Sequence, residues 1–223
     1  MQTYFRTQSI GSNKRARTRG MLIDSAIEVF STKGIEDASI NEITAMAGMA
    51  NGTFYNHFKD KDDVAYASTE AIALEIAKQL NDRMNDLDQG VSRVVVASWS
   101  FICIALAARP WGRVLVSQYQ RRPVAESSAF EYMRGDIQRA VTQRNLDVTV
   151  DWFLLEQIAA LMMTALRGML GGELRTELLA RTCENILRLL GMTPLQAKRE
   201  LARVSRHALL DPNASGVAIS SEI

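Results

Sequence analysis

The chain has 223 residues, of which 47% are hydrophobic and 23% are charged, so it is long and apolar enough to bury a substantial core. Its 26 basic and 25 acidic residues leave a net charge of +1, which excludes a polybasic nucleic-acid coat and an acidic disordered tail. Two cysteines are too few for a disulfide framework or a multi-cysteine zinc site. They are typical of a reducing compartment, so we expect a cytoplasmic protein.

The N-terminal quarter of the chain has the pattern of three helices. Residues 17–33 predict an amphipathic first helix that ends at Gly34. Ser39 and Glu42 have the spacing of a capping box, in which the two side chains satisfy free amides at the start of a short second helix. A third short helix is expected over residues 51–57.

The rest of the chain predicts longer and more apolar helices. A helix from Lys61 to about Met84 has Asp60 as its N-cap. Beyond it we expect helices over 91–108, 111–120, 128–145, 150–170 and 173–190, and a last one after Thr193. The uncharged segment 94–108 is shorter than the ~20 residues of a membrane span, so it is interpreted as a buried core helix, with no membrane partner.

These patterns together predict an all-α fold, because strand-like alternation of β-branched residues is absent. We expect an N-terminal three-helix domain over residues 14–60, joined by a long helix to a C-terminal helical bundle over residues 61–210. The two ends of the chain, residues 1–13 and 211–223, are expected to fray.

Residues 39–58 have the pattern of a helix-turn-helix, since two short helices meet at Gly48, a residue that tolerates the positive φ of a tight turn. The outward face of the helix expected over residues 51–57 is polar and partly aromatic and carries no acids. This composition suits contacts with phosphates and base edges in a major groove. Six basic residues flank it and add electrostatic attraction to DNA: Lys14, Arg15, Arg17, Arg19, Lys59 and Lys61.

The stretch AGMANGTFYNHFKDK, from Ala47 to Lys61, resembles the signature of the TetR family of bacterial transcriptional regulators. The resemblance covers about residues 14–65 and implies binding to double-stranded operator DNA. The contacts that it implies to phosphates or base edges come from Ser39, Asn51, Gly52, Thr53, Tyr55, His57 and Lys61. One departure is Ala50, which stands where the family usually has a serine or threonine that caps the recognition helix, a loss of ~1 kcal/mol.

The resemblance also implies a homodimer, because paired half-sites need paired recognition helices. In the family, the last two helices of the core usually build the interface, here the helices near 150–170 and 173–190. Their apolar positions either form this interface or face the subunit's own core, and both interpretations stay open. These positions are Ile158, Leu161, Met162, Ala165, Met169, Leu178, Leu179, Cys183, Ile186 and Leu190.

A small-molecule effector is a further implication of the resemblance, bound in a mostly apolar cavity between the helices near 91–108, 111–120, 128–145 and 150–170. Methionine and aromatic side chains there favour an apolar or aromatic ligand. Arg167 either anchors a polar group of the ligand or lies on the surface at a helix C-terminus. The candidate lining residues are Trp99, Phe101, Cys103, Trp111, Tyr119, Phe130, Met133, Phe153, Met163 and Arg167.

Two other classes of protein compete with a ligand-released repressor. A structural, nucleoid-organising protein of the same fold needs no effector and therefore no cavity. An enzyme needs catalytic groups, but the sequence has no P-loop, G-x-G-x-x-G, G-x-S-x-G or H-E-x-x-H motif, and its two histidines, His57 and His207, are far apart. The expectation is therefore a regulator without enzymatic activity, cofactor or metal.

Overall fold

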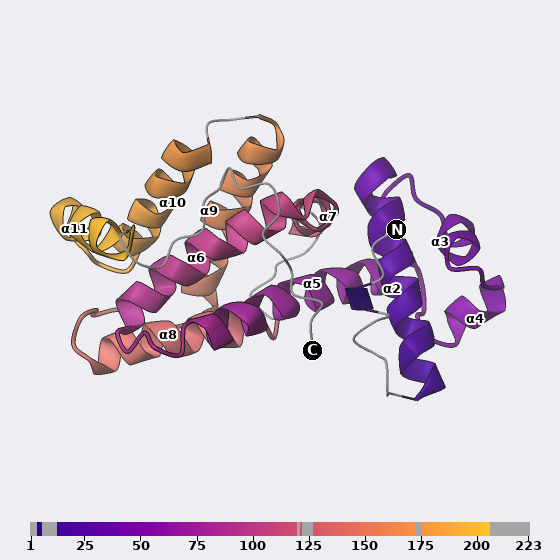
Figure 1. Cartoon of the computed structure of the whole chain (residues 1–223), viewed down its shortest axis with the longest axis horizontal. Coiled ribbons are helices and arrows are strands. Elements are labelled where there is room, and N and C mark those ends of the chain that lie inside the picture. Colours follow the sequence, from indigo (N-terminus) through magenta and orange to yellow (C-terminus); the bar gives the residue numbers. More distant parts are fainter. Residues whose placement is uncertain (1–3, 6–12, 120, 122–126, 173–174, 206–223) are drawn as a thin grey trace.

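The computed structural model describes residues 4–5, 13–119, 121, 127–172 and 175–205, and most of these are helical (Figure 1). The predicted all-α fold is confirmed. The ends expected to fray, 1–13 and 211–223, lie outside the described residues apart from Tyr4, Phe5 and Asn13. The helices of the described part are α2 (Lys14–Lys33), α3 (Ile40–Met46), α4 (Asn51–Tyr55), α5 (Lys61–Arg83), α6 (Gly90–Ala107), α7 (Arg109–Tyr119), α8 (Phe130–Thr142), α9 (Trp152–Leu170), α10 (Arg175–Leu189) and α11 (Pro194–Ser205).

The helices α2, α3 and α4 form a small unit at one end of an elongated molecule (Figure 1). Leu22, Ile43, Phe54 and Phe58 close its core, and all four side chains are buried. Gly48 adopts a φ of 67° in the turn between α3 and α4, as the sequence predicted, and a residue with a Cβ would be strained there. This turn sets the angle at which α4 leaves α3.

Side-chain caps define where the N-terminal helices begin. The predicted capping box is confirmed: the amide of Glu42 donates to Ser39 Oγ over 3.3 Å, and the amide of Ser39 donates to Glu42 Oε2 over 3.0 Å. Asp60 caps α5 as predicted, accepting from the amide of Asp63 over 2.8 Å. Asn13 accepts from the amide of Ala16, and this cap starts α2 three residues earlier than the sequence indicated.

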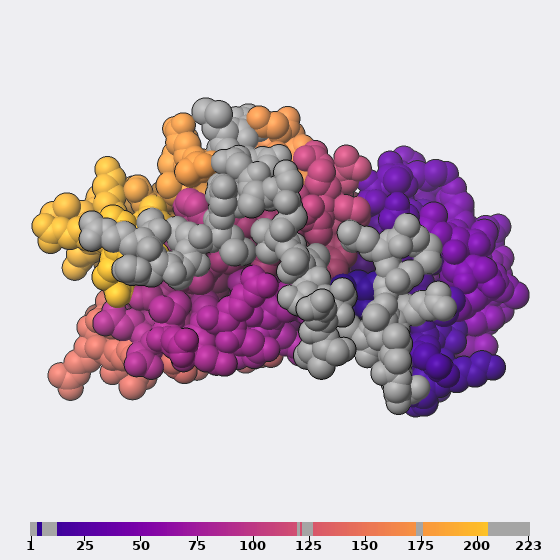
Figure 2. All heavy atoms as spheres, in the orientation of Figure 1, coloured from indigo at the N-terminus to yellow at the C-terminus, as the bar shows by residue number. Residues whose placement is uncertain are grey.

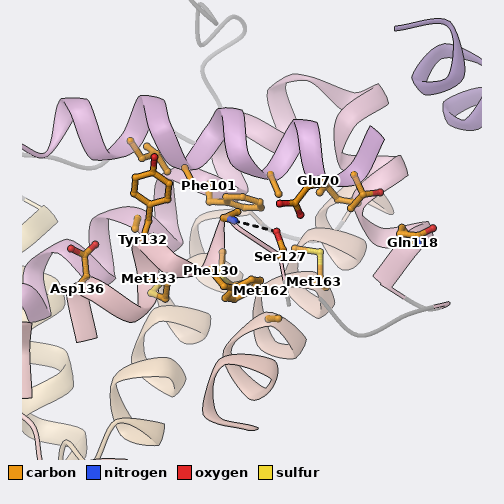
Figure 3. Close-up of a pocket in the computed structure, with 18 of the residues that line it drawn as sticks. Glu70, Phe101, Gln118, Ser127, Phe130, Tyr132, Met133, Asp136, Met162 and Met163 are labelled. Carbon is orange, nitrogen blue, oxygen red and sulfur yellow. Dashed lines mark hydrogen bonds between the residues drawn. The ribbon is translucent and has the colours of Figure 1, made fainter. Parts of the chain in front are cut away.

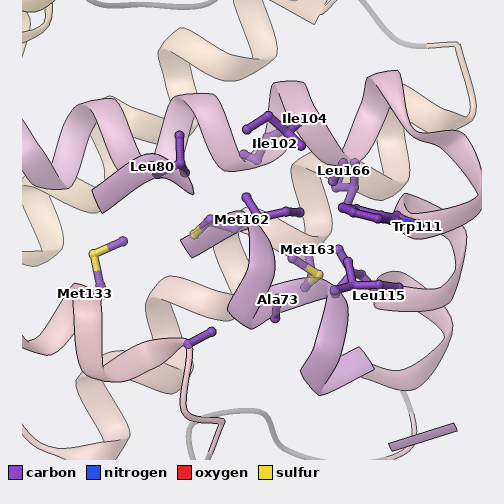
Figure 4. Close-up of a cluster of buried hydrophobic side chains, with 14 of the residues drawn as sticks. Ala73, Leu80, Ile102, Ile104, Trp111, Leu115, Met133, Met162, Met163 and Leu166 are labelled. Carbon is purple, nitrogen blue, oxygen red and sulfur yellow. The ribbon is translucent and has the colours of Figure 1, made fainter. Parts of the chain in front are cut away.

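The second unit is a bundle of longer helices, which α5 joins to the first (Figure 1). Its central helix, α6, packs on α5, α7, α8, α9, α10 and α11. Both α6 and α9 are long and apolar enough to cross a membrane, but 83% of the apolar window of α6 is buried inside the fold. The apolar side chains of α6 therefore serve the bundle core, part of which Figure 4 shows around Ile102, Ile104 and Leu166.

Candidate DNA-binding face and ligand cavity

The helix α4 lies on the surface at the far end of the N-terminal unit (Figure 2). Its Tyr55 is 60% exposed, and the Tyr55 ring stands edge-on to the buried Phe54 ring at 5.4 Å. Gly52 is also exposed, and a Cβ built on it would meet no atom within 4 Å. Packing inside the protein therefore does not require glycine at this position. A glycine here would instead let the backbone of α4 come close to a binding partner.

The side chain of Asn51 joins the two helices of the helix-turn-helix. Its Oδ1 accepts from Thr44 Oγ1 over 2.6 Å, and its Nδ2 donates to Asn41 Oδ1 over 2.5 Å. The side-chain amide of Asn51, for which the family resemblance implies a base contact, is thus already hydrogen-bonded within the protein. These bonds tie the start of α4 to α3, where Ala50 provides no side-chain cap.

Ser39 and Lys61, two predicted phosphate contacts, also have partners within the protein. Ser39 Oγ donates to Glu42 Oε2 over 2.9 Å, and hydrogen bonds from Lys33 and then Ser39 lower the pKa of Glu42 to about 2. Lys61 Nζ donates to the carbonyls of Glu36 and Ala38, at 2.5 and 3.0 Å. Both side chains therefore hold the turn that leads into α3.

Basic side chains at the start of α2 lie beside the C-terminal end of α4. Arg19 lies over the Phe58 ring, 5.1 Å from its centroid, and Arg15 donates to the carbonyl of Asn56 over 3.5 Å. Partial burial, followed by the positive charges of Arg15 and Arg19, lowers the pKa of His57. Near neutral pH, His57 is therefore an uncharged side chain within a positively charged surface.

The bundle contains a cavity of about 90 Å³, bounded by α5, α6, α7, α8 and α9. Figure 3 shows Phe101, Phe130, Met162 and Met163 in its middle, Gln118 at one end and Asp136 at the other. The remaining lining residues are mostly small or apolar, with a few polar side chains: Tyr66, Thr69, Glu70, Ala73, Ala77, Leu80, Met84, Ala97, Leu115, Ser127, Ala129, Tyr132, Met133 and Ala159.

Four of the ten candidate pocket residues line this cavity: Phe101, Phe130, Met133 and Met163. On α6 the cavity side carries Ala97 and Phe101, so Trp99 and Cys103 fall on another face of the same helix. The other four candidates are also absent from the lining. Trp111 packs on the rings of Tyr4 and Phe5, Tyr119 bonds Glu156, and Phe153 and Arg167 are exposed.

Most of one cavity wall comes from α5, for which the sequence indicated only a linking role. Residues 66, 69, 70, 73, 77 and 80 line the cavity at the three- and four-residue spacing of one helix face. This stripe of small and polar residues was a signal in the sequence. Gln118 was missed as well, because a single polar residue in α7 has no periodic signature.

The two polar side chains at the ends of the cavity differ in whether they have hydrogen-bond partners. Asp136 accepts from Arg93 Nε over 2.5 Å, and burial raises the pKa of Asp136 while Arg93 opposes the shift. Arg93 also donates to the carbonyl of Met84 and to Asn81 Oδ1. Gln118 is 5% exposed, and its Oε1 has no hydrogen-bond partner among the described residues.

The apolar positions considered for a dimer interface divide into two sets. Eight of them are buried in the chain's own core, which favours the second of the two interpretations for these positions: Ile158, Met162, Ala165, Met169, Leu179, Cys183, Ile186 and Leu190. Leu161 and Leu178 are half-buried and line a groove between α9 and α10, together with Leu189. Periodicity could not separate the two sets, because both helices are apolar around more than one face.

The helix α7 connects the cavity with the N-terminal unit. Leu115 and Gln118 line the cavity from α7, while Arg113 on the same helix donates to the carbonyl of Ser31 at the end of α2 over 3.0 Å. Just after α7, Arg121 forms ion pairs with Glu36 and with Asp62, at the start of α5. A displacement of α7 would therefore act directly on both units.

Comparison with known proteins shows that the N-terminal unit is similar to a known family. Residues 22–68 match the family model described as "Bacterial regulatory proteins, tetR family". The transcriptional regulator SrpR of Pseudomonas putida is 28% identical over 151 residues, which is 60% of this chain and 66% of SrpR. AcrR of Shigella flexneri is 43% identical over 47 residues, 21% of this chain and 22% of AcrR. The chain thus matches less than two thirds of the length of these relatives.

Solved structures extend the likeness to the bundle. The crystal structure of RolR in complex with resorcinol has a TM-score of 0.71 and 21% identity, covering 90% of this chain and 98% of that one. FadR from Bacillus subtilis in complex with stearoyl-CoA has a TM-score of 0.57 and 14% identity, covering 78% and 98%. Both structures share the fold of this chain, a helical N-terminal unit followed by a helical bundle.

Proposed function

We propose that this chain, a TetR-family protein by its N-terminal domain, is a cytoplasmic repressor that binds operator DNA as a homodimer and leaves it when a small ligand fills the bundle cavity. The exposed face of α4 is the observation that carries this proposal. Tyr55 and Gly52 are exposed there, a Cβ built on Gly52 would meet no described atom within 4 Å, and exposed arginines of α2 flank the face. A polar, acid-free face with adjacent positive charge is complementary to a DNA groove.

The cavity favours a ligand-controlled regulator over a nucleoid-organising protein. Its volume of about 90 Å³ exceeds the ~15 Å³ that one water molecule needs. Two fold neighbours, RolR in complex with resorcinol and FadR in complex with stearoyl-CoA, support a ligand-binding role for a protein of this fold. The mostly apolar lining of this cavity supports an apolar or aromatic ligand here.

The contacts of α7 supply a route by which the ligand could control DNA binding. A ligand that contacts Leu115 and Gln118 and favours one position of α7 would shift the domain that holds α4, through Arg113 and Arg121. Release requires that the ligand bind more tightly to the arrangement in which the two recognition helices no longer match successive major grooves.

DNA selection from a random pool, followed by gel-shift titration, tests the DNA-binding part. We expect Tyr55→Ala to weaken binding of the selected sequence about tenfold. This loss corresponds to the free energy of one or two hydrogen bonds or contacts. Tyr55→Phe keeps the ring and separates the contribution of the hydroxyl. Circular dichroism should show the same melting temperature for all three proteins, because Tyr55 is exposed. Unchanged affinity in Tyr55→Ala, or a pool that yields no bound sequence, would contradict the proposal.

A further inference from the structure

The amide of Gln118 is the most informative polar group in the cavity. It is 5% exposed, its Oε1 has no partner among the described residues, and the side chain lines the cavity. A buried amide without a partner costs free energy in the folded chain. The chain therefore carries an unsatisfied hydrogen-bonding group at the end of the cavity nearer the N-terminal unit (Figure 3).

We propose that the cavity accepts a compact, uncharged ligand whose hydroxyl group forms a hydrogen bond with Gln118. The inference rests on the proposed role of the cavity as the effector site and names the ligand chemistry for it. A hydroxyl both donates and accepts, so it pairs with the amide whether the oxygen or the nitrogen of Gln118 faces the cavity.

The side chains in the middle of the cavity indicate the shape of the ligand. Phe101 and Phe130 present aromatic surface there, and Met133, Met162 and Met163 present flexible thioethers, a combination that packs well against a ring. The volume of about 90 Å³ is smaller than the ~150 Å³ cavity that admits benzene, so the flexible methionine side chains would have to move to admit a ring. A single ring therefore fits better than a long chain.

The charge of the ligand follows from the acidic groups that line the cavity. Glu70 and Asp136 are the charged side chains among its described lining residues, and both carry carboxylates. Arg93 does not line the cavity and already binds Asp136, Asn81 and the carbonyl of Met84. An anionic ligand would be desolvated beside these carboxylates, so a neutral ligand is favoured.

Calorimetric titration of the DNA-free protein with three probes tests the proposal. Phenol and toluene have the same shape and differ in the hydroxyl, while benzoate adds a negative charge. We expect phenol to bind about tenfold more tightly than toluene, the size of one neutral hydrogen bond, and benzoate to bind more weakly than phenol. In Gln118→Met, which keeps the length of the side chain, toluene should bind more tightly than phenol.

The control variant is Gln138→Met, which makes the same exchange on the exposed side of α8 and should leave all three affinities unchanged. The melting temperature of ligand-free Gln118→Met should not fall, because the variant removes an unsatisfied amide. The proposal is overturned if toluene binds the wild type as well as phenol does, if Gln118→Met keeps the preference for phenol, or if no probe binds at millimolar concentration. Because no DNA is present, these outcomes are independent of whether the chain represses transcription.

Discussion

Single residues in the DNA-binding face fall into two groups with different physical roles. Asn51, Ser39 and Lys61 make short hydrogen bonds within the protein, so their first contribution is to hold α4 and the turn before α3. Tyr55 and Gly52 are exposed, and the Tyr55 hydroxyl forms no hydrogen bond with another described residue. Substitutions at Tyr55 and Gly52 can therefore weaken DNA binding without destabilising the protein, whereas substitutions at the first three would weaken both.

Gly52→Ala should weaken operator binding while stabilising the protein. The new Cβ meets nothing inside the chain, and alanine favours a helix over glycine by up to about 1 kcal/mol. We expect operator affinity to fall about tenfold, because the methyl group occupies space that the DNA backbone or a base edge needs. Gel-shift titration and thermal melting measure the two effects.

Gly135→Ala is the matched control, since Gly135 is also an exposed helical glycine, and a Cβ added there would meet nothing within 4 Å. It should stabilise the protein without changing operator affinity. If both glycine variants bind the operator like the wild type, Gly52 has no part in DNA recognition.

At the scale of helices, α7 has the position from which the cavity can act on the DNA-binding domain. It lines the cavity with Leu115 and Gln118, and it bonds the end of α2 through Arg113. Beyond its C-terminus, Arg121 pairs with acidic residues on both sides of the helix-turn-helix, Glu36 and Asp62. Partly exposed ion pairs contribute little to stability, so their loss should alter coupling more than folding.

The double variant Arg113→Gln with Arg121→Gln should reduce the effect of ligand on DNA binding. Coupling free energies between sites are typically 1–3 kcal/mol, and loss of about 1 kcal/mol would reduce the ligand-induced change in operator affinity about fivefold. The measurement is the ratio of operator dissociation constants with and without a saturating cavity ligand. Ligand affinity of the free protein should stay within about twofold, because neither arginine lines the cavity.

Arg134→Gln provides the comparison for this double variant, because it breaks an ion pair with Glu131 inside α8 that does not involve the DNA-binding domain. In the Arg134→Gln protein, the ligand should change operator affinity as much as it does in the wild type. An unchanged ratio in the double variant would show that α7 is not the connecting element.

At the scale of the whole molecule, the proposed dimer surface lies on the outer side of α9 and α10. The residues there that remain partly exposed include Leu161, Leu178 and Leu189, around a groove between the two helices. Helices near the other end of the chain hold the DNA-binding face (Figure 1). We propose two-fold pairing through the surface of α9 and α10, because half-sites about 34 Å apart require two copies of α4 on one DNA duplex.

Leu161→Glu should give a monomer that binds the operator poorly. A stable two-fold interface buries more than ~1,000 Å², and a carboxylate in its apolar centre would be desolvated without a partner. Light scattering at micromolar concentration measures the assembly, and gel shift measures the loss of operator affinity. Ile186→Glu would be a poor test, because Ile186 is 1% exposed within the subunit and a charge there would unfold the chain.

The control for assembly is Leu195→Glu, which places the same charge on an exposed leucine of α11. This variant should stay dimeric and bind the operator. A wild-type chain that scatters as a monomer, or a dimeric Leu161→Glu, would remove the proposed interface.

The helical fold, the caps at Ser39 and Asp60, the turn at Gly48 and the helix-turn-helix motif could all be predicted from the sequence. Each of these depends on residues within a few positions of one another, where backbone amides and φ angles are satisfied locally. The same local patterns carried the family resemblance, which the match over residues 22–68 confirms.

The way in which the apolar helix faces pack against one another could not be predicted from the sequence. Periodicity shows that α6 and α9 are apolar, but it cannot say that Phe101 faces the cavity while Trp99 does not, or that Ile186 is internal while Leu161 remains at the surface. Gln118 is the clearest example. Glutamine is common in amphipathic helices, and only the packing of neighbouring helices shows that this side chain is buried. Burial and the loss of hydrogen-bond partners arise from contacts between helices distant in sequence, and these contacts are what the local pattern does not contain.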